Sequence, residues 1–101
     1  MNYKVLGRTG LNVSVLSYGA APLGEEYGKV IFKEAHDSVH YAIENGINFF
    51  DVAPYYGGFL AEKRLGRILR HKRKEVILST KVGRYKNRSE EYFDFSEKGI
   101  R

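Results

Sequence analysis

The sequence predicts an α/β fold in which an N-terminal hairpin is followed by about three parallel strands that alternate with helices. Apolar residues recur at helical spacing in two segments, residues 30–46 and 59–72. Short, β-prone apolar runs lie before, between and after these segments, at residues 15–19, 47–51 and 75–81. Strands separated by helices run parallel, and continuous runs such as "NFF" and "VIL" are typical of strands buried on both faces.

The first elements are two short strand-like runs and a helix. "YKVLG" and "LNVSVLSYG" are joined by "GRTG", whose glycines suit a tight hairpin turn. The second run can divide, so that "VLSYG" forms the first strand of the larger sheet. The helix predicted over residues 30–46 ends at Asn45-Gly46, a typical C-terminal stop.

The second half repeats this alternation. A strand over residues 47–51 precedes a helix over 59–72, and a strand over 75–81 follows that helix. Residues 82–95 are polar and are predicted to be irregular. Ser96 is a suitable N-cap for a helix that begins in "SEKGIR".

The composition is that of an ordinary globular domain or part of one, with 101 residues and a net charge of +5. The absence of cysteine excludes disulfides, thiolate metal sites and thiol nucleophiles. No apolar run approaches the roughly 18 residues of a membrane span, and the N-terminus lacks the apolar core of a signal peptide. A cytoplasmic location is therefore expected.

Much of the positive charge lies in one segment, which contains Lys63, Arg64, Arg67, Arg70, Lys72, Arg73 and Lys74. A nucleic-acid-binding surface is one interpretation. The favoured interpretation is a solvated helix face, because the apolar residues of the segment form a separate stripe and no aromatic residues interleave with the cations. That stripe contains Leu60, Leu65, Ile68 and Leu69.

Opposite charges close two consecutive strands. Asp51 ends one apolar run and Lys81 ends the next, thirty positions later, which is about one βα repeat. Both side chains are expected at the C-terminal edge of the parallel sheet, where βα proteins keep their chemistry. Charged strand ends can also simply mark an exit to solvent, but opposite signs allow pairing, and Tyr56 follows Asp51 in a loop punctuated by proline and glycine.

An aspartate, a lysine and a tyrosine together can form an acid/base site. An ammonium near a phenol stabilises the phenolate and so lowers the pKa of the phenol from its reference value near 10. Such a phenol can exchange a proton with a substrate at working pH.

Three segments resemble the opening of the aldo-keto reductases, namely "GRTGLNVSVLSYGAAPLG", "INFFDVAPYYGGFLAEKRLG" and "VILSTKVGRYK". The resemblance implies a partial (β/α)8 barrel, the TIM barrel, and an oxidoreductase that uses NAD or NADP with a small carbonyl or sugar substrate. "APYYGG" and "GRYKNRSEEYFDFS" are similar to loops of sugar dehydrogenases of the L-galactose dehydrogenase, or aldose dehydrogenase, type.

The resemblance also assigns roles to residues. Tyr56 matches the family's proton donor and acceptor, Lys81 the residue that tunes it, and Asp51 the partner of that lysine. Cofactor contacts are implied near the nicotinamide for Gly19, Ala20, Ala21 and Asp51.

The resemblance assigns no catalytic role to two neighbouring residues. Tyr55 either lines the substrate pocket or packs in the loop. Glu62 matches a family glutamate and is interpreted as structural, near a helix N-terminus, although Ala61 replaces the usual serine.

The fourth member of the family's catalytic set, a histidine, is expected at the end of the next strand and has no match here. His36, His40 and His71 all fall in predicted helices. His36 and His40 have the spacing of a metal pair but lack a third ligand, so they are interpreted as exposed helix residues and no metal site is expected.

A closed barrel needs about 250 residues, so three units predict an N-terminal portion of a longer domain, weakly folded and inactive alone. The main cofactor loops would then lie in later units. Two alternatives remain, a non-catalytic partial barrel that self-associates through its open face and a small basic nucleic-acid-binding module. Substrate, NAD or NADP, and the direction of the reaction are left open.

Overall fold

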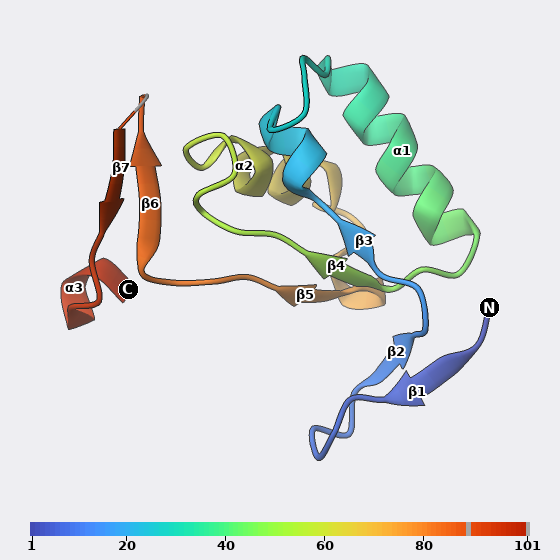
Figure 1. Cartoon of the computed structure of the whole chain (residues 1–101). Coiled ribbons are helices and arrows are strands. Elements are labelled where there is room, and N and C mark those ends of the chain that lie inside the picture. Colours follow the sequence, from blue (N-terminus) through green and yellow to red (C-terminus); the bar gives the residue numbers. More distant parts are fainter. Residues whose placement is uncertain (89, 101) are drawn as a thin grey trace.

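The computed structural model describes residues 1–88 and 90–100, and its first elements follow the predicted order (Figure 1). The elements are β1 (Tyr3–Val5), β2 (Asn12–Ser14), β3 (Tyr18–Gly19), the 3-10 helix η1 (Ala21–Gly24), α1 (Phe32–Glu44), β4 (Phe49–Asp51), α2 (Leu60–Ile68), the 3-10 helix η2 (Arg73–Glu75), β5 (Ile77–Ser79), β6 (Arg84–Asn87), β7 (Glu90–Phe93) and α3 (Glu97–Ile100).

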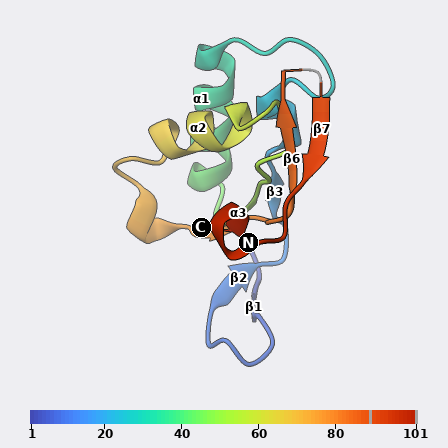
Figure 2. The ribbon, with the colours of Figure 1, turned by 90° about the vertical axis from the view of Figure 1, so that its left-hand side faces the viewer.

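The central sheet has the strand order β3-β4-β5, and both pairings are parallel. The predicted division of residues 11–19 is confirmed, because β2 pairs with β1 in the hairpin while β3 pairs with β4. Figure 2 shows that α1 and α2 both lie on the same side of this sheet. The α/β alternation predicted from the sequence is therefore correct.

The hydrophobic core lies between the sheet and the two helices. Tyr18, Phe50 and Leu78 stand in register across the three strands and pack into this core, where Phe50 is fully buried. Successive side chains of a strand point to opposite faces, so Phe49 and Ile77 lie on the other face, where both remain partly exposed. Within the described residues the helices cover one face of the sheet and leave the other open, as expected for a partial barrel.

The β1–β2 hairpin is fastened to the start of β4 through Asn48. The Asn48 side chain accepts a hydrogen bond from Ser14 N at 2.7 Å and donates one to Asn12 O at 2.9 Å. The backbone N–H of Asn48 donates to Ser14 Oγ at 3.1 Å. The hairpin therefore lies at the N-terminal end of β4, at the edge opposite Asp51 (Figure 1).

The helix predicted over residues 59–72 ends earlier, at Ile68. After Leu69 the chain turns through η2, with Lys72 N donating to Leu69 O at 2.8 Å and Glu75 N donating to Lys72 O at 2.9 Å. These turns bring the chain back to the start of β5, whose Ile77 N donates to Asn48 O at 2.7 Å. The placement of His71 in a helix was therefore wrong.

The third strand is also shorter than predicted, since β5 spans Ile77–Ser79. Glu75 belongs to η2, and Lys81 comes two residues after the strand rather than at its end.

The segment predicted to be irregular forms a second antiparallel hairpin, β6–β7. Tyr85 pairs with Tyr92 across it, with ring centroids 5.4 Å apart, and Arg84 Nη2 lies 2.7 Å from Glu91 Oε2. Cross-strand aromatic and charge pairs stabilise such hairpins, even in a polar sequence.

The N-cap prediction for Ser96 is confirmed, because Ser96 Oγ accepts a hydrogen bond from Gly99 N at 3.1 Å. Arg101, the last residue of the predicted helix, lies outside the described residues.

Adjacent phenylalanines provide a test of one-sided burial. Phe50→Ala should remove most or all of the cooperative unfolding transition of the 101-residue chain, because a cavity under both helices costs about 3–5 kcal/mol and the chain is expected to be only weakly folded. Phe49→Ala, the matched control, should cost much less, because that side chain is already partly exposed. Urea unfolding followed by circular dichroism measures both, and equal losses would contradict the proposed position of the core.

Candidate active site

Asp51 and Lys81 meet at the C-terminal edge of the sheet. Lys81 Nζ donates to Asp51 Oδ1 and Oδ2 at 3.1 and 3.0 Å and to Val52 O at 2.9 Å. The strand register explains the meeting, since Asp51 pairs with Ser79, and Lys81, two residues later, returns to the same face. The predicted pairing of these two residues is thus present in the structure.

Tyr56 lies beside this ion pair. The Lys81 ammonium is over its ring, 5.5 Å from the centroid, within the range of a cation–π interaction. Tyr56 is half-buried against the core, and the preceding residues Val52 and Ala53 are buried. The loop that carries the phenol is therefore anchored by packing, although it contains no regular element before α2.

A close backbone contact fixes the other side of this loop. A Cβ on Gly57 would collide with the backbone of Gly24, and a Cβ on Gly24 would collide with the backbone of Tyr56. Gly57 has a positive φ of 68° and donates its N–H to Glu26 Oε2 at 3.0 Å. Glycine is required at both positions because the loop after β3 and the loop after β4 touch through their main chains.

The residues expected near a cofactor differ in their exposure to solvent. Gly19 pairs with Asp51, is exposed, and has open space where a Cβ would be. Ala20 is fully buried in the core, and its N–H donates to Asp51 O at 2.8 Å. Ala21 begins η1 and is half-buried. The open surface next to the ion pair is thus provided mainly by Gly19.

Tyr55 packs against the second hairpin. The Arg84 guanidinium lies 3.8 Å from the centroid of its ring, and Lys86 Nζ lies 5.3 Å away. One face of the ring is therefore covered by β6. The Arg84 guanidinium also lowers the pKa of the Glu91 carboxyl, mainly through their hydrogen bond.

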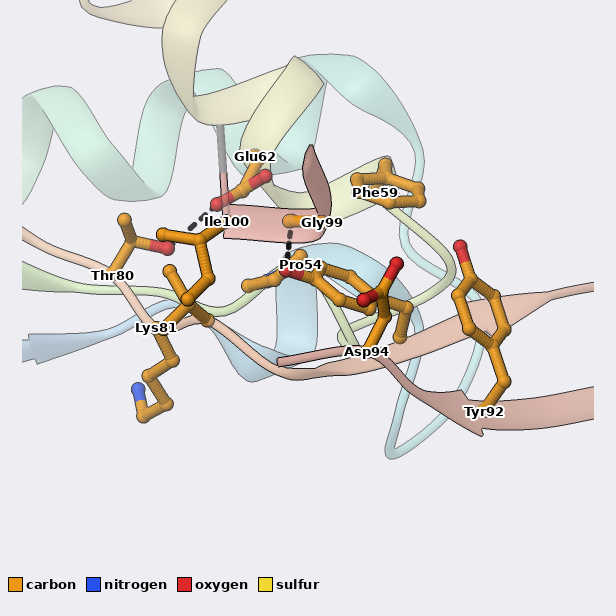
Figure 3. Close-up of a pocket in the computed structure, with 11 residues that line it drawn as sticks. Pro54, Phe59, Glu62, Thr80, Lys81, Tyr92, Asp94, Gly99 and Ile100 are labelled. Carbon is orange, nitrogen blue, oxygen red and sulfur yellow. Dashed lines mark hydrogen bonds between the residues drawn. The ribbon is translucent and has the colours of Figure 1, made fainter. Parts of the chain in front are cut away.

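A hollow of about 350 Å³ opens between the end of β5, the start of α2 and the unit formed by β7 and α3 (Figure 3). On its wall, Thr80 Oγ1 donates to Glu62 Oε1 at 2.6 Å. Figure 3 shows the Lys81 side chain extending away from this pair. Glu62, interpreted from the sequence as structural, thus links α2 to the residue before Lys81, a link that sequence reasoning missed.

The other predicted features lie away from this edge. His36 and His40 are on α1 with ring centroids 4.2 Å apart. Within residues 1–88 and 90–100, no group of three or more potential metal ligands is close enough to hold an ion. In the same part of the chain, no helix is long and apolar enough to cross a membrane.

Some cations of the basic segment take part in packing. Arg64 Nη1 donates to Leu23 O at 3.1 Å, and the Arg67 guanidinium lies 4.6 Å from the centroid of Phe32. Leu65, Ile68 and Leu69 of the predicted apolar stripe are buried.

Comparisons with known proteins identify relatives of this chain. A model described as the aldo/keto reductase family matches residues 15–101. L-galactose dehydrogenase of Arabidopsis thaliana is 48% identical over 101 residues, which is 97% of this chain and 30% of that protein. Pyridoxal 4-dehydrogenase of Microbacterium luteolum is 44% identical over 81 residues, covering 80% of this chain and 24% of that protein.

A solved structure of an aldo-keto reductase from Bacillus halodurans, in its holo form, superposes with a TM-score of 0.86. The sequence identity is 31%, and the match covers 99% of this chain and 33% of that one. This similarity confirms the predicted fold class, a partial (β/α)8 barrel. The chain spans about a third or less of the length of these relatives.

The contact between Gly24 and Gly57 can be tested by substitution. Gly57→Ala should destabilise the chain and displace the Tyr56 loop, because the new methyl group meets backbone that cannot rotate away. Gly66→Ala is the matched control, since a Cβ there meets nothing and alanine is favoured over glycine in a helix by up to about 1 kcal/mol. In thermal unfolding, the melting temperature of Gly66→Ala should equal or exceed that of the parent chain. A melting temperature of Gly57→Ala equal to that of the parent chain would refute the contact.

Proposed function

Because the chain belongs to the aldo/keto reductase family, we propose that it is the N-terminal part of an oxidoreductase domain. This domain transfers hydride between a nicotinamide cofactor, NAD or NADP, and a carbonyl compound or an aldose. The observation that carries the proposal is the meeting of Asp51, Tyr56 and Lys81 at one edge of the sheet. The names of the relatives, which are dehydrogenases of L-galactose and of pyridoxal, support it.

Tyr56 is the proposed acid/base. When an aldose is oxidised, the phenolate of Tyr56 accepts the proton of the anomeric hydroxyl while the anomeric carbon loses hydride, and a lactone forms. In the opposite direction, the phenol donates its proton to the carbonyl oxygen. A positioned group of this kind contributes about 10²–10⁴-fold to rate.

Lys81 and Asp51 support the phenol electrostatically. The three N–H groups of the ammonium face three acceptors, which are the two carboxylate oxygens of Asp51 and the carbonyl of Val52. This fixes the positive charge beside the ring of Tyr56. Lys81 therefore stabilises charge, and Tyr56 moves the proton.

The sheet edge beside Asp51 is open at Gly19. Within the described residues, a Cβ at position 19 would meet no other atom, so packing does not explain why Gly19 is a glycine. We assign Gly19, Ala20, Ala21 and Asp51 to the neighbourhood of the nicotinamide, with Ala20 contributing only through its backbone because its side chain is buried. When bound, the nicotinamide accepts or donates the hydride at the substrate carbon.

The open face of the sheet supports the proposal that further βα units complete the domain. Phe49 and Ile77 on that face are partly exposed, and Val82 is exposed close to Lys81. In a closed barrel such residues are packed in the interior. Tyr55, held under Arg84, then shapes the mouth of the site and the substrate space.

The proposal is tested with the complete protein, including any further barrel units that its gene encodes. Formation or loss of reduced nicotinamide is followed with NAD and NADP, using L-galactose, other aldoses, pyridoxal and simple aldehydes. Tyr56→Phe should lower kcat by about 10²-fold or more and leave cofactor affinity nearly unchanged, because only the hydroxyl is removed. Tyr41→Phe, a control at an exposed tyrosine of α1, should retain turnover within a few fold.

Two results would count against this assignment. If Tyr56→Phe stays within a few fold of the parent enzyme, Tyr56 is not the acid/base. If the protein binds cofactor but turns over none of these substrates in either direction, the proposed reaction class is wrong.

The ion pair gives a separate prediction. Lys81→Met should reduce kcat strongly, because the charge beside Tyr56 is lost, and Asp51→Asn should reduce it less, because Val52 O still holds the ammonium. The double variant should be no worse than Lys81→Met alone, since the two residues act as a unit. Steady-state kinetics with matched cofactor-binding measurements decide this, and additive losses would argue for independent roles.

A further inference from the structure

A second hollow, of about 330 Å³, lies between α1 and the end of α2, away from the sheet edge that carries Asp51. Two apolar residues, Phe32 and Ile68, line it. Every other residue that lines it is a histidine or a cation: His36, His40, Arg67, Arg70, His71 and Lys72. The three histidines of the chain are therefore gathered at one surface hollow.

The early end of α2 produces this arrangement. His36 and His40 stand one turn apart on α1, and their ring centroids are 4.2 Å apart. The last residue of α2 is Ile68. The turns that follow it carry Arg70, His71 and Lys72, which line the same hollow. The Arg67 guanidinium is held over the ring of Phe32, 4.6 Å from its centroid.

The positive charge of this hollow is only partly balanced. Asp37 Oδ1 is 3.3 Å from His36 Nδ1, but Asp37 also binds Lys33 at 2.6 Å, and the pKa of Asp37 is lowered mainly by Lys33. Glu75 lies 3.5 Å from Lys72. Within the described part of the chain, the side chains of Arg70 and His71 form no hydrogen bond or ion pair.

We propose that this hollow binds a small phosphate-type anion, either free phosphate or the phosphoryl group of a small metabolite. Guanidinium groups match phosphate oxygens in a planar, two-point geometry, and imidazoles add further donors. The volume falls at the lower end of the range for small-molecule sites, roughly 300–1,000 Å³. A metal is disfavoured, because the neighbouring arginines and lysine repel a cation.

A nucleic-acid strand fits the hollow less well. Strands bind on exposed aromatic faces along a continuous groove. The aromatic residue in this lining, Phe32, has a ring face occupied by Arg67. The site therefore suits a compact anion.

The experiment uses the complete protein with any further barrel units, and follows the ring signals of the three histidines by NMR. Inorganic phosphate and sulfate are titrated at one fixed pH, with chloride holding the ionic strength constant. Saturable shifts of all three histidines are expected with both anions. Arg70→Gln should weaken binding about tenfold, the usual effect of losing one charge-assisted hydrogen bond.

Lys63→Gln is the matched control, because it removes one exposed charge from α2 outside the hollow. It should leave the affinity unchanged. His71→Asn provides a second hollow variant if Arg70→Gln folds poorly. Non-saturating shifts, equal losses in Arg70→Gln and Lys63→Gln, or an oligonucleotide that binds with equal dependence on Lys63, Lys74 and Arg70 would each overturn the proposal.

Discussion

The parallel pairing of β4 with both β3 and β5 is the constraint on which the rest of this structure depends. Each helix returns the chain to the same end of the sheet, so consecutive strands leave it at the same edge. The register then places Gly19, Asp51 and Ser79 side by side, and Lys81 follows on the same face. The ion pair of Asp51 with Lys81 is a direct consequence of this pairing rather than of a separate folding event.

The two ends of the three-residue strand β4 serve different purposes. At its start, Asn48 fastens the N-terminal hairpin through side-chain and backbone hydrogen bonds. At its end, Asp51 binds Lys81, and the following loop presents Tyr56. Between them, Phe50 is buried under both helices. Stability and the proposed chemistry therefore depend on the same short segment, and the contact of Gly24 with Gly57 holds its loop from the other side.

The helices cover only one face of the sheet, and this explains both the open face of the sheet and the hollow on the outer side of the helices. The helices shield Phe50 and Leu78 but not Phe49 or Ile77, which fits the proposal that further βα units cover that face. The two helices turn their apolar stripes toward the core, so polar side chains gather on the outer surface, where His36 and His40 are partly buried. The outer hollow thus arises from the same amphipathic pattern that builds the core, and it is separate from the proposed catalytic edge.

The sequence by itself determined the order of the sheet strands and first two helices, the residues of the ion pair and the cap at Ser96. These features follow from local periodicity, cap chemistry and the spacing of the strands along the chain, all of which can be read directly from the sequence. The tertiary structure alone decided where α2 ends, that residues 84–93 form a hairpin, that Thr80 binds Glu62, that Arg84 covers Tyr55 and that three histidines share one hollow. Each of these depends on contacts across turns or between separate elements, because such contacts are made by packing and leave no period in the sequence.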